Sequence, residues 1–480
     1  MNESRPKGRG FRQAVRRRFS GGLIHSLEGE AVPGDLWIEG TLIAAVSPPD
    51  PAPAWDDSEV EVHDARGAWI LPGFVQVHVH LCQTLFRGAG EGRSLESWLR
   101  GVVWPLEAAH TVETIEAAAL CGVRELLRGG TTAILDMGTT RHTEVIARVV
   151  SESGMRAFLG PALMDRGPVP SLQRPTREFF GDLDALAAAW HGHDDGRIRI
   201  ALCPRFVPSV TGAFFEEIAA RPEYARFPIH THGSETRHEV EETRALTGET
   251  PPVYLSRLPG AQDRVKMAHG VWLDDRDREH LARAGAAVLH CPGSNFKLGS
   301  GLADILALRR AGIRVGLGAD GAACNNRLDP WNEMRLAALI QSVLHGPDTV
   351  HPREILRLAT IEGARALGLD EEIGSLRAGK RADFVIVDPA EDPASLAGVS
   401  ALEDPVAALV FAGDPSWVRE TWVHGRRCYP SMTAPEERAD FVQRVRRAAA
   451  TLAGRTGLPS PPEPTAGRQP SSSDRATGDG

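Results

Sequence analysis

Short apolar runs of strand length alternate with helical patterns through the middle of the chain. We identify eight such runs, at residues 68–81, 131–137, 156–164, 198–206, 227–233, 265–273, 286–294 and 314–322. Between them lie helical patterns, such as the one that starts at Thr111 and stops at Gly129. Strands that alternate with helices pair in parallel through right-handed crossovers. Eight such units over roughly 250 residues predict an α/β fold with a (β/α)8 barrel of the TIM type at residues 68–371, and an open doubly wound sheet is the alternative.

The two ends of the chain have a different pattern, in which short apolar runs alternate with turns. LIHSL, DLWIEG, LIAAVS and VEVHD lie within residues 19–67, and similar segments return at 372–389, 407–413 and 418–429. Such runs are typical of antiparallel strands. Because these segments flank a long middle, we expect residues 19–67 and 372–431 to form one small, discontinuous β-sandwich domain.

The outermost segments differ again. Residues 1–18 are basic and predict a disordered start, although Arg16, Arg17 and Arg18 could belong to a twin-arginine export signal. The apolar stretch that such a signal needs is missing, so we favour the disordered start. Residues 432–454 predict a C-terminal helix, and the Pro-, Ser- and Gly-rich residues 455–480 predict a disordered tail.

Charge and cysteine content narrow the range of partners. The 54 basic and 63 acidic side chains leave a net charge of −9, which argues against nucleic acid as a general partner. Six cysteines without a CxxC pair fit a reducing compartment, and no apolar run is long enough for a membrane span. We therefore expect a cytoplasmic protein that acts on a small molecule, as a homo-oligomer (dimer or tetramer).

Histidine and aspartate side chains recur where the predicted strands end. His78 and His80 share one face of the first strand, because residues two apart on a strand point the same way. His232 ends the fifth strand, His269 lies in the sixth, and Asp320 ends the eighth. The carboxyl ends of barrel strands meet at one rim, where active sites assemble. Imidazole and carboxylate together predict a divalent metal site at this rim, for zinc or iron.

Further polar residues accompany this set. Glu235 follows His232 by three residues, within reach of a water at the predicted site, so it could accept and deliver protons. The small residues around Asp320 in GLGADGAACNN allow a close backbone approach. His230 and His290 are either supports for the metal ligands or structural residues, and the sequence leaves both readings open.

These motifs together resemble the amidohydrolase superfamily. The segments LPGFVQVHVHLCQTLFRG, SWLRGVVWPLEAAHT, LHCPGSNFKLGSG and GLGADGAACNNRLDPWNEMR are similar to its branch of 5′-deoxyadenosine, S-adenosylhomocysteine and methylthioadenosine deaminases, guanine-type deaminases and triazine hydrolases. The likeness extends from about residue 20 to 430. It implies that His78, His80, His232 and Asp320 bind one metal ion, Zn²⁺ or Fe²⁺.

The resemblance also implies roles for other residues. Glu235 would move protons, His269 would polarise the attacking water, and Asp320 would act as a base as well as a ligand. Trp98 would pack near the substrate, and Glu107 would bind ribose hydroxyls. Binuclear relatives carry a bridging Lys where this chain reads IRIALCPRF, so one metal ion is implied.

Arg205 and Phe206 occupy the region where some thioether-nucleoside deaminases place a substrate-binding histidine. We therefore expect Arg205 to face the substrate, and we favour 5′-deoxyadenosine or a related nucleoside over S-adenosylhomocysteine. The predicted activity is a mononuclear deamination of an adenine-type nucleoside that releases ammonia. A guanine-type or s-triazine hydrolase is the alternative, and a non-catalytic assembly protein is disfavoured because all four ligands are present.

Overall fold

A computed structural model describes residues 14–389, 404–430 and 435–457 of the chain. Residues 1–13 of the predicted disordered start and 458–480 of the predicted tail therefore lie outside the described residues. Within the described ranges, no helix combines the length and apolar character that a membrane crossing requires.

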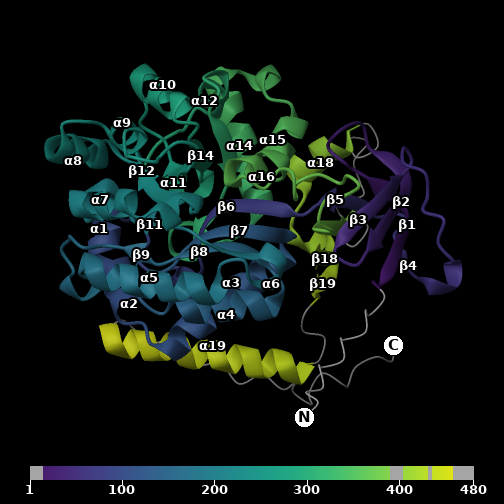
Figure 1. Ribbon diagram of the computed structural model, residues 1–480, viewed down its shortest axis with the longest axis horizontal. Coiled ribbons are helices and arrows are strands. Elements are labelled where there is room, and N and C mark those ends of the chain that lie inside the picture. Colours follow the sequence, from purple (N-terminus) through teal and green to yellow (C-terminus); the bar gives the residue numbers. More distant parts are fainter. Residues whose placement is uncertain (1–13, 390–403, 431–434, 458–480) are drawn as a thin grey trace, which may run out of the picture.

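Parallel strands form the centre of the molecule, with helices around them (Figure 1). Every predicted apolar run of the middle region contains strand residues, although the runs at 68–81, 156–164, 198–206 and 314–322 are each split between two strands. The first part of 68–81, β5 (Trp69–Pro72), joins the sheet of the chain ends and not the parallel sheets. One sheet has the order β10 (Ile198–Ile200), β8 (Arg156–Gly160), β7 (Thr131–Met137), β6 (Phe74–His80) and β16 (Asp320–Gly321). A second has the order β12 (Ile229–Gly233), β13 (Val265–His269), β14 (Ala287–His290) and β15 (Arg314–Leu317), and β9 (Ala162–Leu163) pairs with β11 (Cys203–Pro204).

The two parallel sheets approach each other at both edges. On one side, β15 leads within three residues into β16, which pairs with β6. On the other, single parallel bridges join Leu202 to Ile229 and Phe206 to His232. Among the described residues, the ladder at these two seams is not a continuous strand pairing. The α/β character of the prediction is confirmed, and ring closure stays a prediction.

Helices follow the strands along the chain as the sequence pattern predicts. α3 is an example, because Thr111 caps its first turn in a reciprocal capping box with Thr114, and the helix ends at Gly129. The helices of the middle region are α1 (Leu95–Trp98), α2 (Trp104–Ala108), α3 (Val112–Arg128), α4 (Thr143–Ser153), α5 (Thr176–Trp190), α6 (His193–Gly196), α7 (Gly212–Ala220), α8 (Arg237–Thr247), α9 (Pro251–Ser256), α10 (Asp275–Arg283), α11 (Pro292–Lys297), α12 (Ile305–Arg310), α13 (Ala322–Asn325), α14 (Pro330–His345), α15 (Pro352–Leu358) and α16 (Ile361–Leu367).

Strands from both ends of the chain lie in one further sheet, to the right in Figure 1. Its order is β19 (Arg426–Tyr429), β18 (Val418–Val423), β17 (Phe384–Val387), β5 (Trp69–Pro72), β1 (Arg16–Ile24), β2 (Val32–Glu39) and β3 (Leu42–Ser47), with β4 (Val60–Asp64) beside β1. Its buried residues include Phe19, Phe384 and Trp422, whose rings pack against one another.

The first strand begins earlier than predicted. Arg16, Arg17 and Arg18 belong to β1, so their assignment to a disordered start is wrong. Acidic residues of neighbouring strands and turns neutralise them: Arg16 Nη1 lies 2.8 Å from Glu59 Oε2, and Arg18 Nε lies 2.8 Å from Asp35 Oδ2. These ion pairs make the arginine run compatible with an ordered sheet.

The C-terminal part also differs from the prediction at one point. Residues 407–413 were expected to form a strand, but they belong largely to helix α18 (Pro405–Ala412). Asp404 caps this helix by accepting from two backbone N–H groups, and Pro405 occupies its first turn. Helix α19 (Pro435–Thr456) includes residues 435–454 of the predicted C-terminal helix, continues for two residues into the predicted tail, and packs against α3 (Figure 1).

Candidate metal centre

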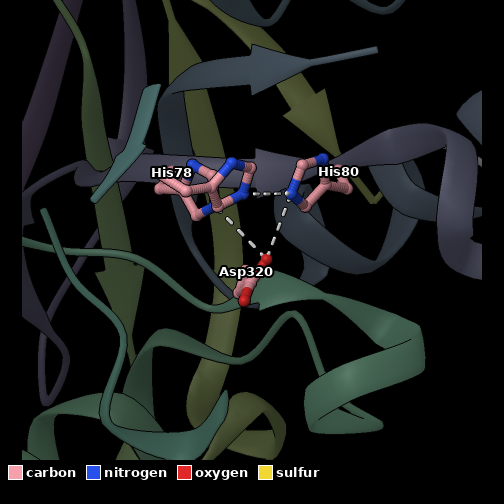
Figure 2. A group of neighbouring side chains, drawn as sticks. His78, His80 and Asp320 are labelled. Atoms are coloured by element: carbon pink, nitrogen blue, oxygen red, sulfur yellow. Dashed lines mark hydrogen bonds and ion pairs between the residues drawn. The ribbon is translucent and has the colours of Figure 1, made fainter. Parts of the chain in front are cut away.

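Four predicted ligands converge at the carboxyl ends of the parallel strands. His78 and His80 end β6, His232 lies in β12, and Asp320 begins β16 beside Val79. One ligand atom from each of the four lies within 4.8 Å of the others. Figure 2 shows the Asp320 carboxylate facing both imidazoles of β6, with Oδ1 at 3.3 Å from His78 Nε2 and 3.2 Å from His80 Nε2. All four side chains are almost completely shielded from solvent or lie at the cavity wall.

Backbone carbonyls determine which ring nitrogen of two histidines carries hydrogen. His80 Nδ1 donates to the carbonyl oxygen of Met137 (2.8 Å), and His232 Nδ1 donates to that of Arg205 (2.6 Å). A neutral imidazole with hydrogen on Nδ1 presents a lone pair at Nε2. The Nε2 atoms of His80 and His232 nevertheless face each other at 3.3 Å. Two lone pairs at this distance repel unless a positive charge lies between them, so the donor set fits a cation.

The electrostatics of the group agree with this interpretation. Burial lowers the pKa of His78 to about 4, and burial together with the neighbouring histidines lowers the pKa of His232 well below its usual value. Burial also acts against a charge on His80, but the Asp320 carboxylate outweighs it and raises the pKa of His80. The two histidines of β6 in turn hold the pKa of Asp320 well below its usual range, despite burial. The space between the three imidazoles and the ionised Asp320 carboxylate therefore favours a positive charge.

The backbone around Asp320 comes unusually close to β6. A Cβ atom added at Gly318 would lie 2.6 Å from the carbonyl oxygen of His78, so only glycine fits there. The predicted role of the small residues before Asp320 is thereby confirmed. Asp320 itself has a φ of +59°, and His269 has +74°. Left-handed conformations of non-glycine residues cost free energy and are typical of functional sites.

Glu235 and His269 lie together beside the four ligands. His269 Nε2 is 3.4 Å from Glu235 Oε2 and 3.9 Å from Asp320 Oδ2. His269 Nδ1 donates to Oδ1 of Asn295 at 2.9 Å, which leaves Nε2 facing the two carboxylates. Burial raises the pKa of Glu235 above its usual value. A carboxyl group that holds a proton at higher pH than usual is suited to both accepting and delivering it.

A cavity of about 300 Å³ opens above this group. Its inner wall contains His80, His232, Glu235, His269 and Asp320. The outer wall is mostly apolar and comes from the segments after β6, β9, β11 and α11, together with acidic and basic residues from α1, α8 and the segments that follow α1 and β9. These outer residues include Leu95, Trp98, Leu99, Trp104, Met164, Phe206, Pro208, Leu298, Glu96, Arg100, Arg166, His238, Glu239 and Glu242. Trp98 thus lines the same cavity as the candidate ligands, and its expected contact with the substrate stays a prediction.

Arg205 and Glu107 form a buried ion pair next to the cavity. Two guanidinium nitrogens of Arg205 contact the Glu107 carboxylate, at 2.5 and 3.1 Å, and Gln83 Nε2 donates to the same carboxylate at 2.9 Å. This pairing lowers the pKa of Glu107 despite its burial. Arg205 lines the cavity, whereas Glu107 lies behind it. The expected contact of Glu107 with ribose hydroxyls stays a prediction.

The two histidines with open roles occupy different surroundings. His230 Nε2 lies 2.6 Å from His78 Nδ1, so His230 supports a candidate ligand. His290 is completely buried, and burial lowers its pKa to about 3. Asn295 and Ser300, which contact His269 and Glu235, were not predicted. Their segment, LHCPGSNFKLGSG, carries part of the family resemblance, but its sequence does not indicate which side chains it contacts.

Comparison with known proteins connects this geometry to a family. Residues 69–428 match the model of the amidohydrolase family. A relative named 5′-deoxyadenosine deaminase, from Methanobrevibacter smithii, is 36% identical over 76% of this chain and 82% of its own length. A relative named 5-methylthioadenosine/S-adenosylhomocysteine deaminase, from Halobacterium salinarum, is 34% identical over 92% of this chain and 99% of its own.

Solved structures of enzymes with related names are also similar to this chain. An adenosine deaminase of Xanthomonas campestris with bound zinc has a TM-score of 0.81 and 29% identity, covering 91% of this chain and 98% of its own. The zinc complex of the atrazine chlorohydrolase TrzN from Arthrobacter aurescens has a TM-score of 0.80 and 26% identity, covering 89% and 100%. The predicted class, a hydrolase acting on C–N bonds, is confirmed by the relatives. Because the family model matches residues 69–428 and these relatives cover most of the chain, the chain belongs to the amidohydrolase family.

Proposed function

We propose that this protein is a mononuclear metal-dependent aminohydrolase that deaminates an adenine-type nucleoside and releases ammonia. The observation that carries the proposal is the pair of facing Nε2 lone pairs on His80 and His232, beside the ionised carboxylate of Asp320. His78, His80, His232 and Asp320 would hold the ion. Their nitrogen and oxygen donors suit Zn²⁺, and Fe²⁺ is the alternative. The zinc-containing structural relatives support this choice.

We also propose that the two parallel sheets together form the (β/α)8 barrel expected within residues 68–371, with β5 (Trp69–Pro72) belonging to the other sheet. The β15–β16 connection and the bridges at Leu202 and Phe206 are the two places where the ring would close. The sheet that combines β1–β5 with β17–β19 would then be the separate β-sandwich domain. This arrangement places the four ligands at one rim of the ring, which is where barrel enzymes carry their active sites.

The residues of the site divide the chemistry among them. A divalent ion bound there would supply a Lewis acid that makes water a nucleophile at neutral pH. Ionised Glu235 accepts one proton from the attacking water, which His269 orients through Nε2, and delivers it to the ring nitrogen next to the amine-bearing carbon. Asp320 accepts the second proton of that water, from the hydroxyl group of the tetrahedral carbon. Asp320 delivers this proton to the amino group as the C–N bond breaks and ammonia leaves.

Charges at the cavity rim favour a nucleoside without a carboxylate tail. Arg100 and His238 both pair with Glu96, at 3.1 and 3.6 Å. Arg166 donates through Nε to the carbonyl oxygen of Pro208 at 2.9 Å. These basic side chains at the rim therefore already have partners. We infer that 5′-deoxyadenosine or methylthioadenosine is a better substrate than S-adenosylhomocysteine, with Trp98 and Phe206 against the flat ring.

The decisive experiment combines metal analysis with an assay of ammonia release. Purified protein loaded with Zn²⁺ or Fe²⁺ is given 5′-deoxyadenosine, methylthioadenosine, S-adenosylhomocysteine, guanine and a set of s-triazines. We expect one ion per chain and the highest kcat/KM for 5′-deoxyadenosine or methylthioadenosine. Preferred turnover of guanine or of a triazine would establish the alternative activity instead. Protein that binds no metal and releases no ammonia would refute both.

A further inference from the structure

One buried segment contacts both Glu235, which we assign to proton transfer, and His269, which we assign to orienting the water. Asn295 lies in α11, and Ser300 follows that helix after Gly299. Asn295 accepts from His269 Nδ1 through Oδ1 at 2.9 Å, and Ser300 Oγ donates to Glu235 Oε1 at 3.3 Å. Asn295 is 1% exposed and Ser300 is 3% exposed, so neither contact competes freely with bulk water.

The segment is itself tightly anchored. The backbone N–H of Ser300 donates to the carbonyl oxygen of Asn295 at 2.8 Å, which fixes the two side chains relative to each other. The indole Nε1 of Trp272 donates to the carbonyl oxygen of Ser300 at 2.8 Å, and the guanidinium of Arg237 lies over the Trp272 ring at 4.2 Å. Ser300 therefore presents its hydroxyl from a backbone that is held on two sides.

The backbone of Glu235 is held separately from its carboxyl group. Its N–H donates to Glu239 Oε2 at 2.9 Å, and the preceding carbonyl, of Ser234, accepts from Val271 and Trp272 at 2.9 and 2.8 Å. These contacts fix where the side chain starts but leave its χ angles free. The Ser300 hydroxyl and the approach of His269 are the contacts that direct the carboxyl group itself.

We propose that the segment from Asn295 to Ser300 is a clamp for acid–base catalysis, in which Ser300 is the positioning residue for the Glu235 carboxyl group and Asn295 for the His269 ring. The proposal rests on the proposed function, because it assigns proton transfer to Glu235. Ser300 donates to Oε1 and leaves Oε2 facing His269 and the cavity. Without the hydroxyl, the carboxyl group can rotate out of the orientation in which it meets a substrate.

Substitution of Ser300 tests the clamp directly. A hydrogen bond to an ionised group of this kind corresponds to about tenfold or more in rate when it is lost. We expect Ser300→Ala in the metal-loaded enzyme to lower kcat by about that factor, with KM, metal content and thermal midpoint close to wild type. Ser300→Thr keeps a hydroxyl and should restore most of the rate. Ser256→Ala, which removes a hydroxyl bound to the Val253 carbonyl in α9, is the matched control and should have no effect.

A double-mutant cycle separates positioning from general damage. Because Ser300 acts through the Glu235 carboxylate, Ser300→Ala should change the residual rate of Glu235→Gln by less than about twofold. An equal loss in both backgrounds would overturn the proposal. So would a kcat of Ser300→Ala within twofold of wild type, or a failure of Ser300→Thr to recover activity.

A second readout needs no turnover and distinguishes failure of the clamp from failure of the proposed function. Crystal structures of the zinc-loaded wild type and Ser300→Ala would be compared at the Glu235 side chain. We expect the wild-type carboxyl group in its approach to His269 and the variant's carboxyl group in another rotamer or in several. An unchanged single rotamer in the variant would overturn the clamp, whatever the substrate panel shows.

Discussion

Replacement of Glu235 by glutamine removes the acid–base function while keeping the shape of the side chain. Glutamine still accepts from the Ser300 hydroxyl and is not one of the four candidate ligands, so metal content should not change. General acid–base catalysis contributes about 10²- to 10⁴-fold, which corresponds to about 2.7–5.5 kcal/mol of activation free energy. We therefore expect kcat for the best nucleoside to fall by at least about a hundredfold.

The pH profile provides an independent check on this assignment. Glu235 must be ionised to accept a proton, and burial raises its pKa above the usual value. Wild-type kcat/KM should therefore decline towards acid pH, beginning at a higher pH than an exposed glutamate would produce. Glu235→Gln should lack this decline, because glutamine does not titrate.

The assay compares initial rates of ammonia release with metal content determined by elemental analysis. Glu241→Gln makes the same chemical change on an exposed position of α8 and should leave both quantities unchanged. The reasoning would be refuted by a Glu235→Gln enzyme that keeps its rate within about threefold of wild type. A variant that loses its metal would show instead that Glu235 helps to hold the ion.

Three further predictions concern the metal, a buried carboxyl group and the backbone. A chelator should abolish ammonia release and lower the thermal midpoint, because an ion that binds only the folded state stabilises it; full activity in verified metal-free protein would contradict this. Burial raises the pKa of Glu239 to about 8, so its folded form keeps a proton that the unfolded chain loses near pH 4.5. Stability is therefore lost as pH rises from about 4.5 to 8, by up to about 1.4 kcal/mol per unit, and chemical unfolding of Glu239→Gln should lack that slope; parallel slopes in both proteins would refute the assignment. Gly318→Val should push Asp320 and His78 apart, which should lower metal occupancy and reduce the free energy of unfolding by about 1–3 kcal/mol. A normal zinc content of this variant in elemental analysis would contradict the prediction.

Sequence reasoning located the four candidate ligands because each is tied to a regular feature. His78 and His80 are separated by the two-residue period of a strand, and His232 and Asp320 stand where apolar runs end. Strand ends converge in an α/β fold for topological reasons, so positions along the chain predict that these residues and His269 meet. Only the family resemblance separates the four candidate ligands from His269. Contacts between loops follow no period, which is why the approach of Ser300 to Glu235 and the pairing of Arg205 with Glu107 could not be predicted.

The errors in the fold have equally specific causes. The run at 407–413 is apolar on all sides, so its pattern does not distinguish a buried helix from a buried strand. Asp404 followed by Pro405 was the available signal, since this pair is typical of a helix start. For β1, the arginines resembled a basic tail because their acidic partners, such as Glu59 and Asp35, lie on other segments.

Arg205 serves two neighbours by different chemical means. Its main-chain oxygen orients His232, which any amino acid at that position could do, while its guanidinium neutralises Glu107. Replacement of only one member of the ion pair would leave the other charge buried without a partner, which should lower the free energy of unfolding by about 3–5 kcal/mol. Exchange of both together would spare the histidine and reshape the cavity wall. We therefore expect paired replacements at these two positions to alter the cavity wall while the four candidate metal ligands stay in place.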